Sequence, residues 1–183
     1  ESGYSATLNQ RMKLAVMEGM WETEPAPAAF TLFGLPDTEA RETHYAVKIP
    51  AVMGLIGTRS LTTDIPGIKE LVAEAEGRIR SGILAYDALQ TIRTERAATP
   101  AEVRAAFEEN GGNLGYGMLL MRYVADPRAA TEEQIAKAAW DTVPNVGPMF
   151  WTFRFMVAAG FAMLGFLAFA FWRTNFRDNT YPT

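Results

Sequence analysis

The chain has 183 residues, of which 49% are hydrophobic and 21% charged, with a formal net charge of −4. This composition is too apolar for a chain that is disordered throughout, and the acidic balance argues against nucleic-acid binding, which needs clustered Lys and Arg. Because the sequence contains no cysteine, disulfide scaffolds, thiolate metal sites and thiol nucleophiles are excluded as well.

The first 65 residues are expected to hold one short helix followed by irregular chain. Apolar residues fall close to one face of a helix over residues 7–22. Pro25 and Pro27 then end that helix, because proline lacks the amide hydrogen and restrains the residue before it. Residues 28–65 show no clear period, and Pro50 interrupts an otherwise apolar run. We therefore predict loop with short helical pieces there.

The central part of the chain carries the clearest helical signals. In residues 66–94 the apolar side chains recur at steps of three and four, which predicts one amphipathic helix. Thr99 and Glu102 form a capping-box pattern with proline at the first helical position. A second helix should therefore start there and stop at Asn110, which two glycines follow.

A second capping pattern, Thr131 with Gln134, opens a further helix that we expect over residues 132–140. The chain shows no period-two alternation of the kind that is typical of strands, and it has no internal repeat. The predicted fold class is therefore all-α.

A long uncharged segment follows near the C-terminus. Residues 155–172 contain no charge, and extending the segment back to Phe150 adds only Arg154 as a charged residue. At 1.5 Å per residue the longer stretch measures about 34 Å, enough to cross a hydrocarbon core of about 30 Å. Aromatic residues flank both ends, as in membrane-interface belts. We predict a transmembrane helix over residues 148–173; the alternative is a buried helix in a soluble core.

The charges around this helix predict its orientation. Arg173 and Arg177 follow the span, so the positive-inside rule places residues 174–183 in the cytoplasm and residues 1–147 outside. The chain opens on Glu1 without a basic and apolar targeting segment. An outside domain without an export signal implies an earlier membrane segment, so we expect a fragment of a larger multi-pass protein.

Two residues early in the membrane helix are candidates for function. A charge such as Arg154 costs on the order of 2.5–3.5 kcal/mol inside a membrane helix. It either extends to the headgroups or has a buried anionic partner, for which a haem propionate would serve. Met156 is either a packing residue or the thioether that, with histidine, ligates low-spin haem in electron-transfer cytochromes.

The remaining candidates lie in the outside domain. Lys13 and Glu18 stand about 140° apart on a straight helix, so they would meet on one ligand only if the helix bends or ends near Gly19; the alternative is a solvated charge pair. Arg59 follows an apolar stretch, which suggests either a binding partner or a helix-terminal cation. His44 is the one histidine, and a single histidine cannot build a metal site.

Several runs of the sequence resemble the quinol-binding loop of cytochrome bd ubiquinol oxidase subunit I. The longest are the run Lys13 to Glu18 and the run Trp21 to Gly34, which contains the unusual sequence W-E-x-x-P-A-P-A-A-F. Agreement continues through residues 49–50, 54–60, 114–117 and 153–158. The resemblance thus covers nearly the whole chain.

The resemblance implies a periplasmic loop between two transmembrane helices of a larger subunit. In that family, quinol is oxidised in this loop. The resemblance assigns the oxidation to Lys13 and Glu18, and it implies quinol-binding neighbours at Arg59, Tyr4 and Phe30.

The resemblance also assigns the start of the membrane helix to haem. It makes Met156 an axial ligand of the low-spin haem b iron, and Arg154 the cation that stabilises this haem. Residues 66–140 resemble the helical insertion of the long-loop branch of the family, which we interpret as structural cover for the site.

The activity implied is that of a terminal respiratory oxidase in the bacterial inner membrane. Quinol, either ubiquinol or menaquinol, would lose two electrons and two protons outside, with Glu18 as general base and Lys13 beside a quinone oxygen. Electrons would pass through low-spin haem b to high-spin haem b and haem d, where oxygen becomes water and a proton-motive force results.

Partners implied are the rest of subunit I, subunit II, small accessory subunits and the lipid bilayer, with no nucleic acid. The histidine ligands of the family are absent from this sequence, so residues 1–183 alone are expected to be inactive. An alternative from another class is a single-span membrane protein whose extracytoplasmic interaction domain has no redox role.

Overall fold

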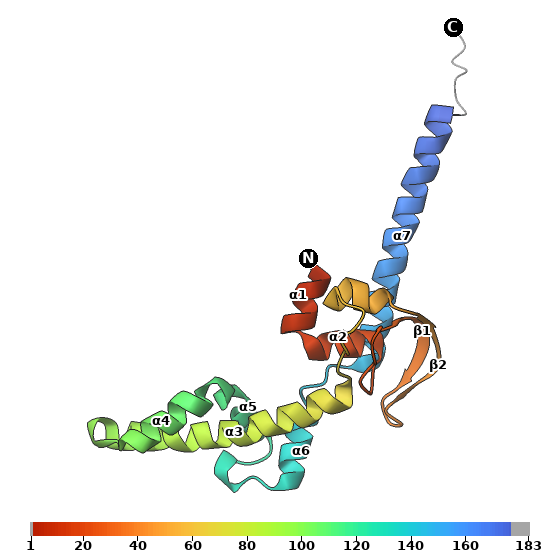
Figure 1. Cartoon of the computed structure of the whole chain (residues 1–183). Coiled ribbons are helices and arrows are strands. Elements are labelled where there is room, and N and C mark those ends of the chain that lie inside the picture. Colours follow the sequence, from red (N-terminus) through yellow and green to blue (C-terminus); the bar gives the residue numbers. More distant parts are fainter. Residues whose placement is uncertain (1, 177–183) are drawn as a thin grey trace.

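The computed structural model describes residues 2–176. They form a folded base (residues 2–67), a helical arm (residues 68–140) and one long helix that projects from the base (Figure 1). Its elements in chain order are α1 (Ser2–Asn9), α2 (Arg11–Glu18), β1 (Phe30–Asp37), β2 (Glu42–Ile49), the π-helical turn η1 (Gly54–Thr58), α3 (Ile68–Glu95), η2 (Arg96–Ala98), α4 (Ala101–Asn110), η3 (Gly111–Asn113), α5 (Leu114–Met118), η4 (Leu119–Arg122), η5 (Pro127–Ala129), α6 (Glu132–Trp140) and α7 (Val146–Phe176).

The predicted N-terminal helix is divided into two. A break at Gln10, where φ is −133° and ψ is 47°, separates α1 from α2. Helix α2 ends on Gly19, whose φ of 63° is the left-handed conformation that glycine adopts without strain. The amide of Gly19 donates to carbonyl oxygens in the last turn, which closes the helix directly after Glu18.

The all-α prediction is wrong for residues 30–49, which form an antiparallel hairpin of β1 and β2. Its open end pairs Phe30 with Ile49, and its turn end pairs Asp37 with Glu42. Two register irregularities interrupt β1, and consecutive apolar residues are exposed there. Because β1 is irregular, its apolar and polar residues do not have to alternate, and the sequence lacks the period-two pattern from which strands are predicted.

One hydrophobic core joins the base to the arm. The start of α3 packs against α2, and the peptide groups of Glu24 and Ile65 pair in an isolated bridge beside it. The core contains these buried side chains: Leu14, Ala15, Val16, Met20, Trp21, Ala28, Met53, Ile65, Ile68, Leu71, Val72, Ala75, Ile79, Leu120, Ile135, Ala138, Ala139 and Val146.

The arm confirms the amphipathic helix that was predicted over residues 66–94, since α3 occupies nearly the same range. Helices α4, α5 and α6 pack along it. Gly82 and Gly117 allow α3 and α5 to approach closely: a Cβ added to Gly82 would lie 2.4 Å from the amide nitrogen of Gly117.

One of the two predicted capping boxes is confirmed. The Thr131 hydroxyl accepts from the amide of Gln134, whose side chain accepts from the amide of Thr131. The box at Thr99 is wrong, because this hydroxyl donates to the carbonyl of Arg96 at 2.7 Å and Pro100 takes the N-cap position. Helix α4 ends at Asn110 as predicted, although the chain continues in helical turns.

Helix α7 contains the predicted membrane span. Val146–Asn175 is long and apolar enough to cross a membrane, with a mean hydropathy of 2.0, and its most apolar window is not buried in the part of the chain that the structure describes. A buried core helix, the alternative, would have that window covered. Arg177 and most of the predicted cytoplasmic end, residues 174–183, lie outside the described residues.

Candidate functional site

A buried ion pair connects the foot of α7 to the loop domain. The Arg154 guanidinium lies 3.4 Å from Oε2 of Glu18, and the two side chains are only 8% and 1% exposed. Of the two alternatives for Arg154, the structure therefore shows the buried anionic partner, which is the carboxylate of Glu18. The alternative in which Glu18 belongs to a solvated charge pair is wrong, because its side chain is buried.

Arg154 also bonds to backbone carbonyls of three elements. Its Nη1 donates to the carbonyl of Met17 on α2 and to that of Phe150 on α7, and its Nη2 donates to the carbonyl of Thr31 on β1. The guanidinium carbon lies 3.4 Å from the ring centroid of Phe150, a cation–π contact. One side chain thus holds α2, β1 and α7 together.

The environment of Glu18 is unusual for a carboxylate. Its Oε2 accepts the Thr31 amide at 3.0 Å, whereas its buried Oε1 has no hydrogen-bond partner among the described residues. Burial raises the pKa of Glu18 from its ordinary value of 4.5 to about 7, and the Thr31 amide and Arg154 offset only part of this effect. Glu18 is therefore a carboxylate that can take up a proton near neutral pH.

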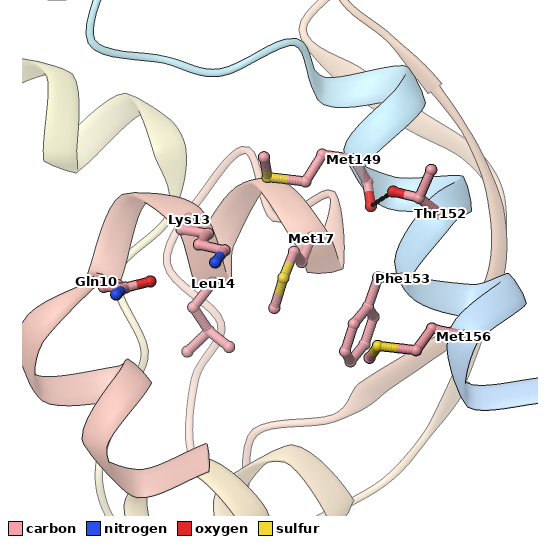
Figure 2. Close-up of a pocket in the computed structure, with 8 residues that line it drawn as sticks. All are labelled: Gln10, Lys13, Leu14, Met17, Met149, Thr152, Phe153 and Met156. Atoms are coloured by element: carbon pink, nitrogen blue, oxygen red, sulfur yellow. Dashed lines mark hydrogen bonds between the residues drawn. The ribbon is translucent and has the colours of Figure 1, made fainter. Parts of the chain in front are cut away.

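A pocket of about 400 Å³ lies beside this ion pair, between α2 and α7. Its lining residues are Gln10, Lys13, Leu14, Met17, Met149, Thr152, Phe153 and Met156. Figure 2 shows Lys13 and Leu14 on α2 and, across the pocket, Phe153 and Met156 on α7. The walls are thus mainly apolar, with one cation, Lys13, and three thioethers, of which that of Met156 belongs to the most exposed residue.

The structure brings together some of the predicted site residues. Lys13 and Met156, which lie 143 positions apart (156 minus 13), line one pocket. Lys13 and Glu18 do not meet in one pocket. Helix α2 does end near Gly19, the condition under which they could share a ligand, but Glu18 is buried against Arg154 and does not line the pocket.

The other predicted quinol neighbours, Tyr4, Phe30 and Arg59, do not line the pocket. The Phe30 ring packs edge-on against that of Phe153, with a centroid distance of 6.4 Å. Arg59 is the residue that ends η1, with a φ of 54°, and its guanidinium carbon lies 4.8 Å from the ring centroid of Tyr4. Arg59 therefore has features of both alternatives: it lies at a helix end and it has a partner in the ring of Tyr4.

Several residues of the site were not predicted from the sequence. The missed lining residues are Gln10, Leu14, Met17, Met149, Thr152 and Phe153. Helical spacing could have found some of them, because Met17 follows Lys13 by four residues and Met149, Phe153 and Met156 recur at steps of four and three. Thr31 acts through its peptide groups, for which the sequence carries no signal.

The donor set fits one side of a haem. Residues 2–176 contain no cluster of three or more His, Asp or Glu side chains that could hold a metal ion. Met156 offers an exposed thioether beside apolar walls, the kind of axial ligand that low-spin haem takes. His44 pairs loosely with Asp37 at 3.8 Å on the hairpin and does not line the pocket.

The structure is a mainly helical domain folded against the foot of a helix that is long and apolar enough to cross a membrane, with a pocket at their junction. Residues 1–181 match the family model described as cytochrome bd terminal oxidase subunit I, so the chain belongs to that family. The resemblance inferred from the sequence is thereby confirmed.

Two relatives support this assignment. The chain is 40% identical over 163 residues to cytochrome bd-II ubiquinol oxidase subunit 1 of Escherichia coli (strain K12), which covers 89% of this chain and 31% of that protein. It is 34% identical over 68 residues to cytochrome bd ubiquinol oxidase subunit 1 of Bacillus subtilis (strain 168), which covers 37% of this chain and 14% of that protein. The chain therefore spans less than a third of the length of either relative.

Proposed function

We propose that this chain forms the quinol-oxidising site of a cytochrome bd-type oxidase subunit I, in the pocket between α2 and α7. The observation that carries the proposal is the shared pocket of Lys13 and Met156, the residues to which the family resemblance assigns quinol and haem contacts. A pocket of about 400 Å³ with mainly apolar walls and a few polar groups suits a quinol ring and the start of its tail.

In this proposal Lys13 orients the substrate. Its ammonium donates a hydrogen bond to a quinol oxygen and stabilises negative charge as that oxygen loses its proton. Oxidation of one quinol releases two protons and two electrons. Glu18 does not line the pocket, so as general base it would take the proton through an intervening water, and a pKa of about 7 is matched to that role.

The electrons leave on the α7 side of the pocket. When bound, a low-spin haem b supplies the electron acceptor there. Met156 would hold its iron through the thioether sulfur, and Arg154, whose guanidinium pairs with Glu18, is the cation that the resemblance assigns to this haem. Phe30 would support the quinol site through its contact with Phe153, and Arg59 and Tyr4, which the resemblance adds to the site, would act from outside the pocket lining.

The proposal extends to the parent protein. Residues 1–147 would be the periplasmic quinol loop, with residues 66–140 as its insertion, and residues 148–173 the membrane helix, with residues 174–183 on the cytoplasmic side. High-spin haem b and haem d, which reduce oxygen to water, and subunit II would lie outside this chain. The substrate class is ubiquinol or menaquinol.

The test is quinol-driven oxygen uptake by membranes that carry the full-length parent. Lys13→Gln should raise the KM for quinol and lower kcat/KM by about tenfold or more, the loss of a charge-assisted hydrogen bond. Arg11→Gln is the matched control, because Arg11 is a cation of the same helix that pairs with Glu74 on the surface. Equal kinetics of the two variants at matched haem content would overturn the proposal.

A further inference from the structure

The hairpin of β1 and β2 exposes a group of apolar side chains. Tyr45 is 81% exposed, and the others are between 41% and 53% exposed. The group, named here the hairpin patch, consists of Leu32, Phe33, Leu35, Tyr45, Val47 and Ile49. Val47 lies opposite Phe33 in the strand register, so part of the group is contiguous across the two strands. Contiguous exposed apolar groups mark contact surfaces.

The open end of the hairpin lies against the foot of α7. The ring of Phe33 packs edge-on against that of Trp151 with a centroid distance of 5.5 Å, and Phe30 contacts Phe153 in the same way. Figure 1 shows the hairpin beside the lower part of α7, with its turn directed away from the projecting half of that helix. The hairpin patch is therefore continuous with the aromatic foot of the apolar helix.

Charge and apolar surface are separated along the hairpin. The turn segment, residues 37–42, contains four charged residues, three acidic and one basic. The open end carries one charged residue, Lys48, which pairs with Glu24. Elements that lie in a membrane interface show this separation, with aromatic and aliphatic groups toward lipid and charges toward water.

Unpaired backbone groups limit how deeply the hairpin can enter a membrane. In the part of the chain that the structure describes, β1 and β2 pair only with each other, so each strand has one unpaired edge. Unpaired amide and carbonyl groups are too costly in the hydrocarbon core, where no partner satisfies them. In the headgroup layer, water and phosphate oxygens can do so.

We propose that the open end of the hairpin lies in the headgroup layer of the leaflet at which α7 enters the membrane. The hairpin patch contacts lipid there, while the charged turn lies on the water side of the layer, where Arg41 packs over the ring of Trp140. The hairpin is thereby a second membrane contact of the loop domain. This inference needs α7 to cross a membrane, but it does not depend on quinol oxidation.

The test uses spin labels on single cysteines, which the 183 residues permit because they contain none. Tyr45→Cys and Val47→Cys report on the hairpin patch, and Leu84→Cys on α3 is the control, since Leu84 is exposed to a similar extent at 59%. The labels are placed in the complete oxidase, with its other cysteines replaced, in phosphatidylcholine vesicles. Collision rates with oxygen, which enriches in lipid, and with a water-soluble nickel chelate are then compared.

The expected result is a ratio of oxygen to nickel collisions that is severalfold higher at both hairpin labels than at Leu84. Nickel collisions at the hairpin as frequent as at Leu84 would place the hairpin in water and overturn the proposal. Low collision rates with both reagents would mean that another polypeptide covers the patch, which overturns it too. Quinol oxidase activity of each labelled variant checks that the oxidase is folded.

Discussion

Replacing Glu18 by glutamine tests whether folding removes its carboxylate from water. Burial raises the pKa of this group from 4.5 to about 7, so between these values the folded protein binds a proton that the unfolded chain releases. Below about pH 4.5 Glu18 is protonated in both states, and the folded protein has its full stability. As the pH rises from there through about 7, the unfolded chain gains from ionising Glu18 first, and the free energy of unfolding falls. The difference between the two pKa values corresponds to about 3 kcal/mol.

Glutamine keeps the shape of the side chain and can still accept the Thr31 amide, but it does not ionise. We expect the free energy of unfolding of Glu18→Gln to rise relative to wild type by about 3 kcal/mol between about pH 4.5 and about pH 8. The measurement is thermal unfolding of the full-length parent in detergent across this range. Glu70→Gln, at an exposed position in the first turn of α3, gives the baseline.

The pH trend of the difference distinguishes a desolvated Glu18 from a solvated one, whatever the absolute stability of the variant. A difference between Glu18→Gln and wild type that stays flat across the range, like that of Glu70→Gln, would show that Glu18 is not desolvated. A trend of the opposite sign would mean that Arg154 dominates and that the carboxylate is more stable ionised in the fold than in water.

Four further substitutions probe the packing and the helix caps, each by thermal unfolding of the parent. Arg154→Met leaves the Glu18 carboxylate without its cation and should destabilise by about 3–5 kcal/mol, more at alkaline than at acidic pH; equal losses would contradict this. Gly82→Ala should destabilise the arm by about 1–3 kcal/mol, since its Cβ would overlap Gly117, whereas Gly77→Ala, with open space around it, should stabilise α3 by about 0.5–1 kcal/mol; the same sign for both would refute the packing argument. Thr131→Ala removes a helix cap and should cost about 1 kcal/mol, and an unchanged midpoint would count against the cap.

Helices with strong local signals were predicted well. The apolar period of α3 and the uncharged length of α7 are properties of the sequence that hold in any surroundings. The capping box at Thr131 formed because its two bonds join residues three apart. The same pattern at Thr99 failed because the preceding chain turns back, and the hydroxyl bonds to Arg96 instead.

The hairpin was missed because its residues do not alternate between core and water. Bulges shift the register of β1, and the hairpin patch leaves apolar side chains exposed that the strand rule expects to be buried. In the position proposed above, the lipid headgroup layer is a third environment for the hairpin, besides the protein core and water. A two-class pattern of apolar and polar residues does not describe it.

The sequence by itself determined the helical arm, the apolar helix and the family, because each depends on runs of neighbouring residues. It also supplied Lys13 and Met156 through the resemblance, without showing that they share a pocket. Only the tertiary structure decided the partner of Arg154, since Glu18 lies 136 positions away. Burial at that junction raises the pKa of Glu18, and desolvation is a property of the packed surroundings, which no local pattern of residues encodes.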